Sequence, residues 1–171
     1  MGALALTGLA MAKSKLIDGP RCSQEEATDM TGKVVVITGG NSGLGKESAI
    51  KLASLGSTVI ILCRDNAKAA SAIDEIALRS GASKSRIEAV ECDLADLSSV
   101  DKCAKVLSGK LDKIDVLLNN AGIMAVPTKQ STKDGFELQM GTNHLGHFAL
   151  TAKLFPLLKK NKSSRVINVS R

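Results

Sequence analysis

The chain has 171 residues, of which 44% are hydrophobic and 23% are charged, a composition typical of one folded domain with a buried core. Only 2% are aromatic, with no Trp and no Tyr, which argues against the base-stacking surfaces of single-stranded nucleic-acid binders. The net charge of +6 is scattered along the chain, so we expect no nucleic-acid partner. One basic run is interpreted as a solvated helix end: Lys159, Lys160, Lys162 and Arg165.

The first 28 residues differ from the rest and are predicted to form a leader or a surface arm, because small, polar and acidic residues follow one another and Gly19-Pro20 interrupts them. No apolar stretch reaches the roughly 18 residues of a membrane-spanning helix, so none is predicted. The cysteines lack C-x-x-C pairing, which indicates a reducing compartment, cytoplasmic or organellar: Cys22, Cys63, Cys92 and Cys103.

From residue 33 onward, short apolar runs alternate with longer helical patterns. Five runs rich in β-branched residues have the length of strands: Val34–Thr38, Thr58–Cys63, Ile87–Cys92, Val116–Leu118 and Val166–Val169. The helical patterns lie near residues 43–55, 66–80, 97–109 and 134–160. Nearly continuous apolar strands are typical of a parallel sheet covered on both faces, so this order predicts an α/β fold with a doubly wound parallel sheet.

The first strand runs directly into a glycine-rich turn and then into a helix. Its spacing, Thr-Gly-x3-Gly-x-Gly, permits a tight turn and lets backbone N–H groups approach a pyrophosphate at the helix N-terminus. A plain strand-to-helix turn is the alternative, and a Walker loop is excluded because Glu47 stands where that loop needs Ser or Thr. We interpret the turn as dinucleotide-binding, with these candidate residues: Gly39, Asn41, Ser42, Gly43, Leu44 and Gly45.

The segment Thr38–Gly45 resembles the T-G-[AG]-N-S-G-[IL]-G motif of the retinol-dehydrogenase-like members of the short-chain dehydrogenase/reductase family. Three further motifs follow in the family's order: Asp93-Leu94 after the third strand, Asn119-Asn120-Ala121-Gly122 after the fourth, and Asn143 in the next helix. The resemblance covers residues 29–171. It implies an incomplete NADP-binding domain, a Rossmann fold of strand order 3-2-1-4-5 truncated after the fifth strand, in an enzyme that interconverts an alcohol and a carbonyl by hydride transfer.

Arg64, at the end of the second strand, indicates which nicotinamide cofactor is bound. An acidic residue there accepts the ribose 2′-hydroxyl of NAD, whereas an arginine pairs with the 2′-phosphate of NADP. The alternative is a solvent-exposed Arg64 paired with Asp65, but we predict NADP. The resemblance further implies adenine contacts from Asp93 and Leu94, and contacts with the nicotinamide-side ribose from Asn120, Ala121 and Gly122.

The resemblance also implies that Asn143 holds a water of the proton relay. The family's carbonyl-orienting Ser aligns with Arg171, so the nearest candidate for that role is Ser170. The family's catalytic Tyr and Lys are absent. The favoured interpretation is an incomplete version of an active enzyme, and the alternative is a short product that binds NADP or a partner without turnover. Such a product would expose apolar helix residues: Leu145, Phe148 and Phe155.

The substrate implied by the resemblance is a small, lipophilic alcohol or carbonyl compound. The helices that usually form the family's dimer interface follow the fifth strand, which leaves a homodimer of the full-length form open. His144 and His147 have helical i, i+3 spacing, but no third ligand candidate accompanies them, so no metal site is predicted. We expect both on a helix packed near the floor of the active site.

Overall fold

A computed structural model describes residues 28–170, so the predicted leader lies outside the described residues except for its last position. Within that range all five strands lie in one parallel sheet of order β3-β2-β1-β4-β5. The strands are β1 (Val34–Thr38), β2 (Thr58–Cys63), β3 (Ile87–Glu91), β4 (Val116–Asn119) and β5 (Arg165–Asn168). The predicted Rossmann topology is thus confirmed, and the strand bounds differ from the predicted ones by one residue at most.

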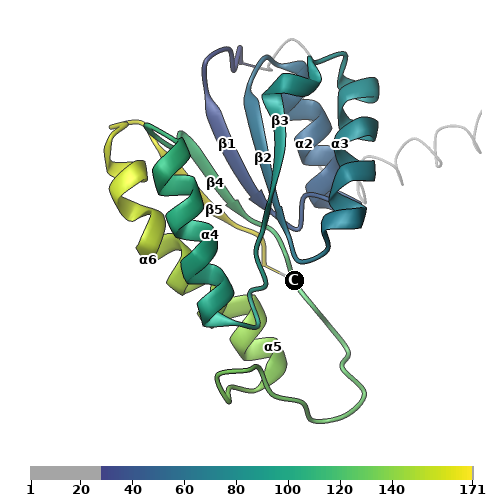
Figure 1. The fold of residues 1–171 in the computed structure, drawn as a ribbon, viewed down its shortest axis with the longest axis vertical. Helices are drawn as coiled ribbons and strands as arrows, with labels where there is room; N and C mark the ends of the chain where they lie inside the picture. The colour runs from purple at the N-terminus through teal and green to yellow at the C-terminus, as the bar shows by residue number, and fades with distance from the viewer. Residues whose placement is uncertain (1–27, 171) are drawn as a thin grey trace, which may run out of the picture.

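Helices cover both faces of this sheet, as Figure 1 shows, with α2 and α3 on one side and α4 and α6 on the other. Successive side chains of β1 point to opposite faces, so Val36 packs toward α4 and α6 while Val35 and Ile37 pack toward α2 and α3. The helical segments are α2 (Gly43–Ser54), α3 (Asn66–Ser80), η2 (Lys84–Arg86), α4 (Leu97–Lys110), α5 (Leu138–Met140), η3 (Gly141–Leu145) and α6 (Gly146–Lys159).

The helix predicted over 134–160 begins later than expected and is not uniform. Gly135 has a φ of +84°, which a helix does not accommodate, and the Glu137 carboxylate then caps the N–H groups of Gln139 and Met140. A π turn, η3, separates the short α5 from α6. Asn143 lies in the middle of this π turn, a distortion that occurs frequently at functional sites.

The outer surface of α6 and the edge strand β5 carry exposed apolar side chains. Phe148 is 70% exposed and Phe155 54%, as expected for the uncovered helix, whereas Leu145 is half-buried. Val166 and Ile167 of β5 are also more than two-fifths exposed. None of the helices between residues 28 and 170 combines the length and the apolar character needed to cross a membrane.

Candidate active site

The carboxyl ends of β1 to β4 meet at one edge of the sheet, beside a cavity of about 760 Å³. In open parallel sheets of this kind, ligands bind outside the carboxyl ends where the strand order reverses, here between β1 and β4. Eleven of the twelve predicted cofactor residues line this cavity: Gly39, Asn41, Ser42, Gly43, Leu44, Arg64, Asp93, Leu94, Asn120, Ala121 and Gly122.

The twelfth residue, Gly45, lies buried behind the cavity wall and sets how tightly the turn folds. A Cβ atom on Gly45 would lie 2.4 Å from the carbonyl oxygen of Gly39 and 2.5 Å from Nδ2 of Asn120. Gly39 and Gly43 have φ angles of +66° and +52°, a backbone region that favours glycine. Gly39 and Gly43 are therefore needed for their left-handed backbone, and Gly45 is needed because other atoms approach its Cα closely.

The N-terminus of α2 faces this cavity with its backbone donors free of side-chain capping. Ser42 occupies the N-cap position in an extended conformation but makes no side-chain capping hydrogen bond, and the first turn contains no acidic residue. A helix N-terminus with uncapped N–H groups and no carboxylate in its first turn suits an anionic group. The turn consequently has the geometry of a phosphate site.

Thr38 and Asn120 join the glycine turn to the end of β4. The Thr38 hydroxyl accepts hydrogen bonds from the backbone N–H groups of Asn120 and Ala121, both at 2.9 Å. The Asn120 side-chain amide donates to the Thr38 carbonyl at 3.0 Å. Thr38 and Asn120 are 1% and 6% exposed, so these bonds are shielded from water and hold the two strand ends together.

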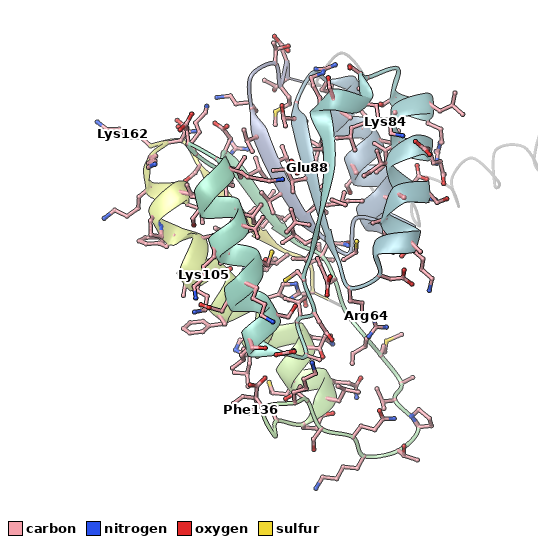
Figure 2. The ribbon with its side chains drawn as sticks, in the orientation of Figure 1. Arg64, Lys84, Glu88, Lys105, Phe136 and Lys162 are labelled. Atoms are coloured by element: carbon pink, nitrogen blue, oxygen red, sulfur yellow. The ribbon has the colours of Figure 1, made fainter. Side chains whose placement is uncertain are left out.

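Arg64 lies at the rim of the cavity, below the carboxyl edge of the sheet in Figure 2. Among the described residues Arg64 has no ion-pair partner. The neighbouring carboxylate of Asp65 instead caps the N–H groups of Ala67 and Lys68 and pairs with the Lys68 ammonium at 3.5 Å. The alternative pairing of Arg64 with Asp65 is therefore not what the structure shows. The exposed guanidinium is available to an anion.

Lys46 and Lys68 also line this cavity, although neither was predicted from sequence as a cofactor residue. Lys46 pairs with Glu75 at 2.6 Å, which leaves part of its charge compensated within the protein. The signal that could have found them is their place in the first turns of α2 and α3, next to the predicted phosphate-binding residues. Because Glu75 and Asp65, which pair with these two lysines, also line the cavity, Arg64 carries the positive charge that no carboxylate pairs with among the described residues.

Asp93 and Leu94 follow β3 on the far side of the same cavity. The Asp93 carboxylate accepts from the Ala95 N–H at 2.9 Å, and the Asp93 N–H donates to the Ser99 hydroxyl, so the loop is fixed to the start of α4. Leu94 is 6% exposed, and a Cβ on Gly146 would lie 2.4 Å from its carbonyl oxygen. This side of the cavity therefore combines the apolar side chain of Leu94 with the polar carboxylate of Asp93.

A second cavity of about 710 Å³ adjoins the first, and both candidate catalytic residues, Asn143 and Ser170, line it. The Asn143 side chain brackets the backbone of Ile123: its Oδ1 accepts from the Ile123 N–H at 2.9 Å and its Nδ2 donates to the Ile123 carbonyl at 2.8 Å. Met124, Met140 and Phe148 supply apolar lining. The residues that line both cavities are Asn120, Ala121, Gly122 and Ile123.

His147 was predicted on a helix near the floor of the site, and it lines the second cavity, but its contacts were not predicted. His147 is 7% exposed and contacts Thr38 from the first cavity and the backbone of Asn143 from the second. The contact with Asn143 could have been expected from sequence, because residues four positions apart are neighbours on one face of a helix. No cluster of three or more His, Cys, Asp or Glu side chains able to hold a metal ion occurs within residues 28–170.

Two buried side-chain oxygens have no hydrogen-bond partner within the described part of the chain, Asn119 Oδ1 and Thr142 Oγ1. Thr142 lines the first cavity and Asn119 the second. Buried polar atoms are rarely left unpaired, because desolvation without a partner costs free energy. A polar ligand, or a water molecule that accompanies it in these cavities, would supply the missing hydrogen-bond partner of each oxygen.

Cys63 and Cys92 line the first cavity, and we expect both thiols to be unreactive in the folded protein. Burial raises the pKa of Cys63, while a hydrogen bond with Cys103 and burial together raise the pKa of Cys92 far above the usual range. Since only the thiolate reacts, alkylation at about pH 8 should be at least about tenfold slower at these residues than in the urea-unfolded chain. Mass spectrometry of the labelled peptides measures both rates; equal rates would contradict the burial.

The family model described as short chain dehydrogenase matches residues 33–171. Human retinol dehydrogenase 13 is 38% identical over 165 residues, which cover 96% of this chain and 48% of that protein. Mouse retinol dehydrogenase 12 is 45% identical over 139 residues, covering 81% of this chain and 43% of that protein. The chain therefore spans about half the length of the curated relatives it matches.

Solved structures have the same arrangement of strands and helices. An uncharacterized protein from Mycobacterium paratuberculosis matches with a TM-score of 0.74 and 45% identity, covering 88% of this chain and 50% of that one. A protein from Escherichia coli CFT073, crystallised with NADPH, matches with a TM-score of 0.68 and 25% identity, covering 81% and 58%.

Proposed function

The chain belongs to the short chain dehydrogenase family, and from that premise we propose that residues 29–171 bind NADP(H) for an oxidoreductase acting on a small lipophilic alcohol or carbonyl. The observation that carries the proposal is the cavity of about 760 Å³ that eleven predicted cofactor residues line at the switch point of the sheet. The NADPH complex of the Escherichia coli protein and the retinol dehydrogenase names of the relatives support the choice of cofactor and substrate class. A cytoplasmic or organellar location and a homodimer of the full-length form remain predictions.

The residues of the first cavity fit an extended dinucleotide. In the proposed arrangement the N–H groups at the start of α2 bind the pyrophosphate, and Asp93 and Leu94 border the adenine. Asn120, Ala121 and Gly122 contact the ribose near the boundary of the two cavities. NADPH, when bound, supplies the hydride; the protein contributes binding, orientation and exclusion of water.

The second cavity is the proposed place of the substrate. Its apolar lining by Met124, Met140 and Phe148 suits a lipophilic compound, and Asn143 and Ser170 are the proposed catalytic residues there. The 171 residues contain no tyrosine, so the proton donor that the family resemblance implies is not among them. The decisive test on this chain is accordingly a binding measurement rather than turnover.

We expect the full 171-residue chain to bind NADPH at least about tenfold more tightly than NADH, because a guanidinium–phosphate contact is a charge-assisted, often bidentate hydrogen bond. Replacing Arg64 by Asp should remove that preference, since a carboxylate repels the 2′-phosphate and accepts the 2′-hydroxyl of NADH. Fluorescence titration of the reduced nicotinamide measures both affinities.

Lys84→Asp is a matched control, because it makes the same charge reversal on η2, outside the residues that line either cavity. Figure 2 shows Lys84 at the opposite end of the sheet from Arg64. This control should leave the ratio of the two affinities unchanged. Equal binding of NADH and NADPH by the unmodified chain, or an unaltered preference after Arg64→Asp, would overturn the assignment of NADP.

A further inference from the structure

His147 contacts one residue that lines each cavity, Thr38 for the first and Asn143 for the second. Its Nε2 is 2.8 Å from the hydroxyl oxygen of Thr38, at the end of β1. Its Nδ1 is 2.8 Å from the carbonyl oxygen of Asn143, in the π turn η3. The imidazole is thus the side chain that joins the strand leading into the glycine turn to the backbone of the candidate catalytic asparagine.

The hydrogen bonds around His147 determine its protonation. The Asn143 carbonyl only accepts, so Nδ1 must carry a proton and donate. The Thr38 hydroxyl already accepts two backbone N–H groups, from Asn120 and Ala121, and these use both of its lone pairs. Its single proton has two acceptors within reach, the Leu118 carbonyl oxygen at 3.5 Å and His147 Nε2 at 2.8 Å. The shorter contact assigns the proton to Nε2, which is therefore unprotonated.

A charged imidazole does not fit this arrangement, because an Nε2–H would point at a hydroxyl with no remaining lone pair. Burial lowers the pKa of His147, and the neighbouring His144 acts in the same direction, against the Asn143 carbonyl, which raises it. The two hydrogen-bond partners of the ring, Thr38 and Asn143, carry no charge. The electrostatic surroundings thus agree with the neutral form that the geometry requires.

We propose that His147, as the neutral tautomer protonated on Nδ1, is a positioning residue that holds Asn143 and the Thr38–Asn120 junction as one hydrogen-bonded unit. The inference rests on the proposed function, since it concerns the geometry between bound cofactor and Asn143. His147 also lines the second cavity, and the role proposed for it lies in its two hydrogen bonds. It acts through Thr38 on the cofactor side and through the π turn on the substrate side.

The first test is spectroscopic and needs no cofactor. Imidazole nitrogens of the 15N-labelled full chain are observed by two-bond proton–nitrogen correlation near pH 6.5, where an unperturbed histidine is about half protonated. We expect His147 to give the neutral pattern with the proton on Nδ1. The His147→Gln variant keeps only the signals of His144 and thereby assigns those of His147. A charged ring, or a proton on Nε2 of neutral His147, would overturn the inference.

The second test is a double-mutant cycle on NADPH affinity. His147→Leu fills similar space without hydrogen bonds and should raise the Kd for NADPH by about tenfold, the usual effect of losing a buried hydrogen-bond partner. Thr38→Val should weaken binding at least as much, and the double variant should bind no worse than Thr38→Val alone because both changes break the same link. Additive losses would show that His147 acts by packing and would overturn the proposal.

His147→Gln separates hydrogen bonding from packing. The glutamine Oε1 can accept the Thr38 proton in place of Nε2. The logarithm of the Kd for NADPH should therefore rise at most half as much in His147→Gln as in His147→Leu. A glutamine variant that binds no better than the leucine variant would contradict the role of Nε2. Failure of the unmodified chain to bind NADPH would overturn the proposed function instead, and the tautomer measurement would still decide whether His147 joins the two segments.

Discussion

Replacing Gly45 by Ala is expected to raise the Kd for NADPH by about a hundredfold or more, because the added methyl group has no space on either side. Its Cβ would lie 2.4 Å from the Gly39 carbonyl oxygen and 2.5 Å from the Asn120 side-chain nitrogen. The first contact is with backbone, which cannot rotate away. The second is with the amide that ties β4 to Thr38, so relief of the clash displaces the N-terminus of α2 and the end of β4 together.

Titration of NADPH fluorescence and the thermal midpoint measure this effect on binding and on folding. Gly109→Ala is the matched control, because Gly109 lies in α4 and a Cβ there meets nothing within 4 Å. The control should retain the affinity and stabilise the chain by up to about 1 kcal/mol, since alanine replaces glycine in a helix. An unchanged affinity in Gly45→Ala would contradict the assignment of this turn to the cofactor.

The five strands could be predicted from sequence because each is a short segment of strand length that contains apolar residues, β-branched ones among them. In β1 every one of Val34 to Thr38 has an apolar or a strand-favouring side chain, and both faces of the sheet are covered. The start of α5 could not be predicted in the same way. Its position depends on the left-handed Gly135 and on the Glu137 cap, whereas the apolar periodicity extends across both.

The candidate cofactor residues were predictable because a turn motif concentrates them at known offsets from a strand end. The unpaired state of Arg64 and the contacts of His147 were not, since the sequence pattern does not show which group a given side chain binds. Asp65 is adjacent to Arg64 in sequence, yet its carboxylate caps α3 and binds Lys68 instead. His147 reaches Thr38 across 109 positions of sequence, a contact that exists only once α6 has packed against the sheet.

Leu154→Ala should lower the free energy of unfolding by about 2–5 kcal/mol, the cost of removing a fully buried leucine and leaving a cavity. Leu154 is 0% exposed and belongs to the core cluster that joins α4 and α6 to the sheet, together with Leu107 and Leu117. This cluster holds α6 against β1 and β4, so the same loss should loosen the contact between His147 and Thr38. Urea unfolding followed by circular dichroism measures the change.

Phe155→Ala is the control at the next position of the same helix. Phe155 is larger than Leu154, but it is 54% exposed and contacts the Lys159 ammonium with its ring centroid 5.8 Å away. Its removal should cost less than about 1 kcal/mol, since little buried surface and one solvated cation–π contact are lost. Equal destabilisation by the two variants would mean that α6 does not pack through its Leu154 face, and the link through His147 would then lack its structural support.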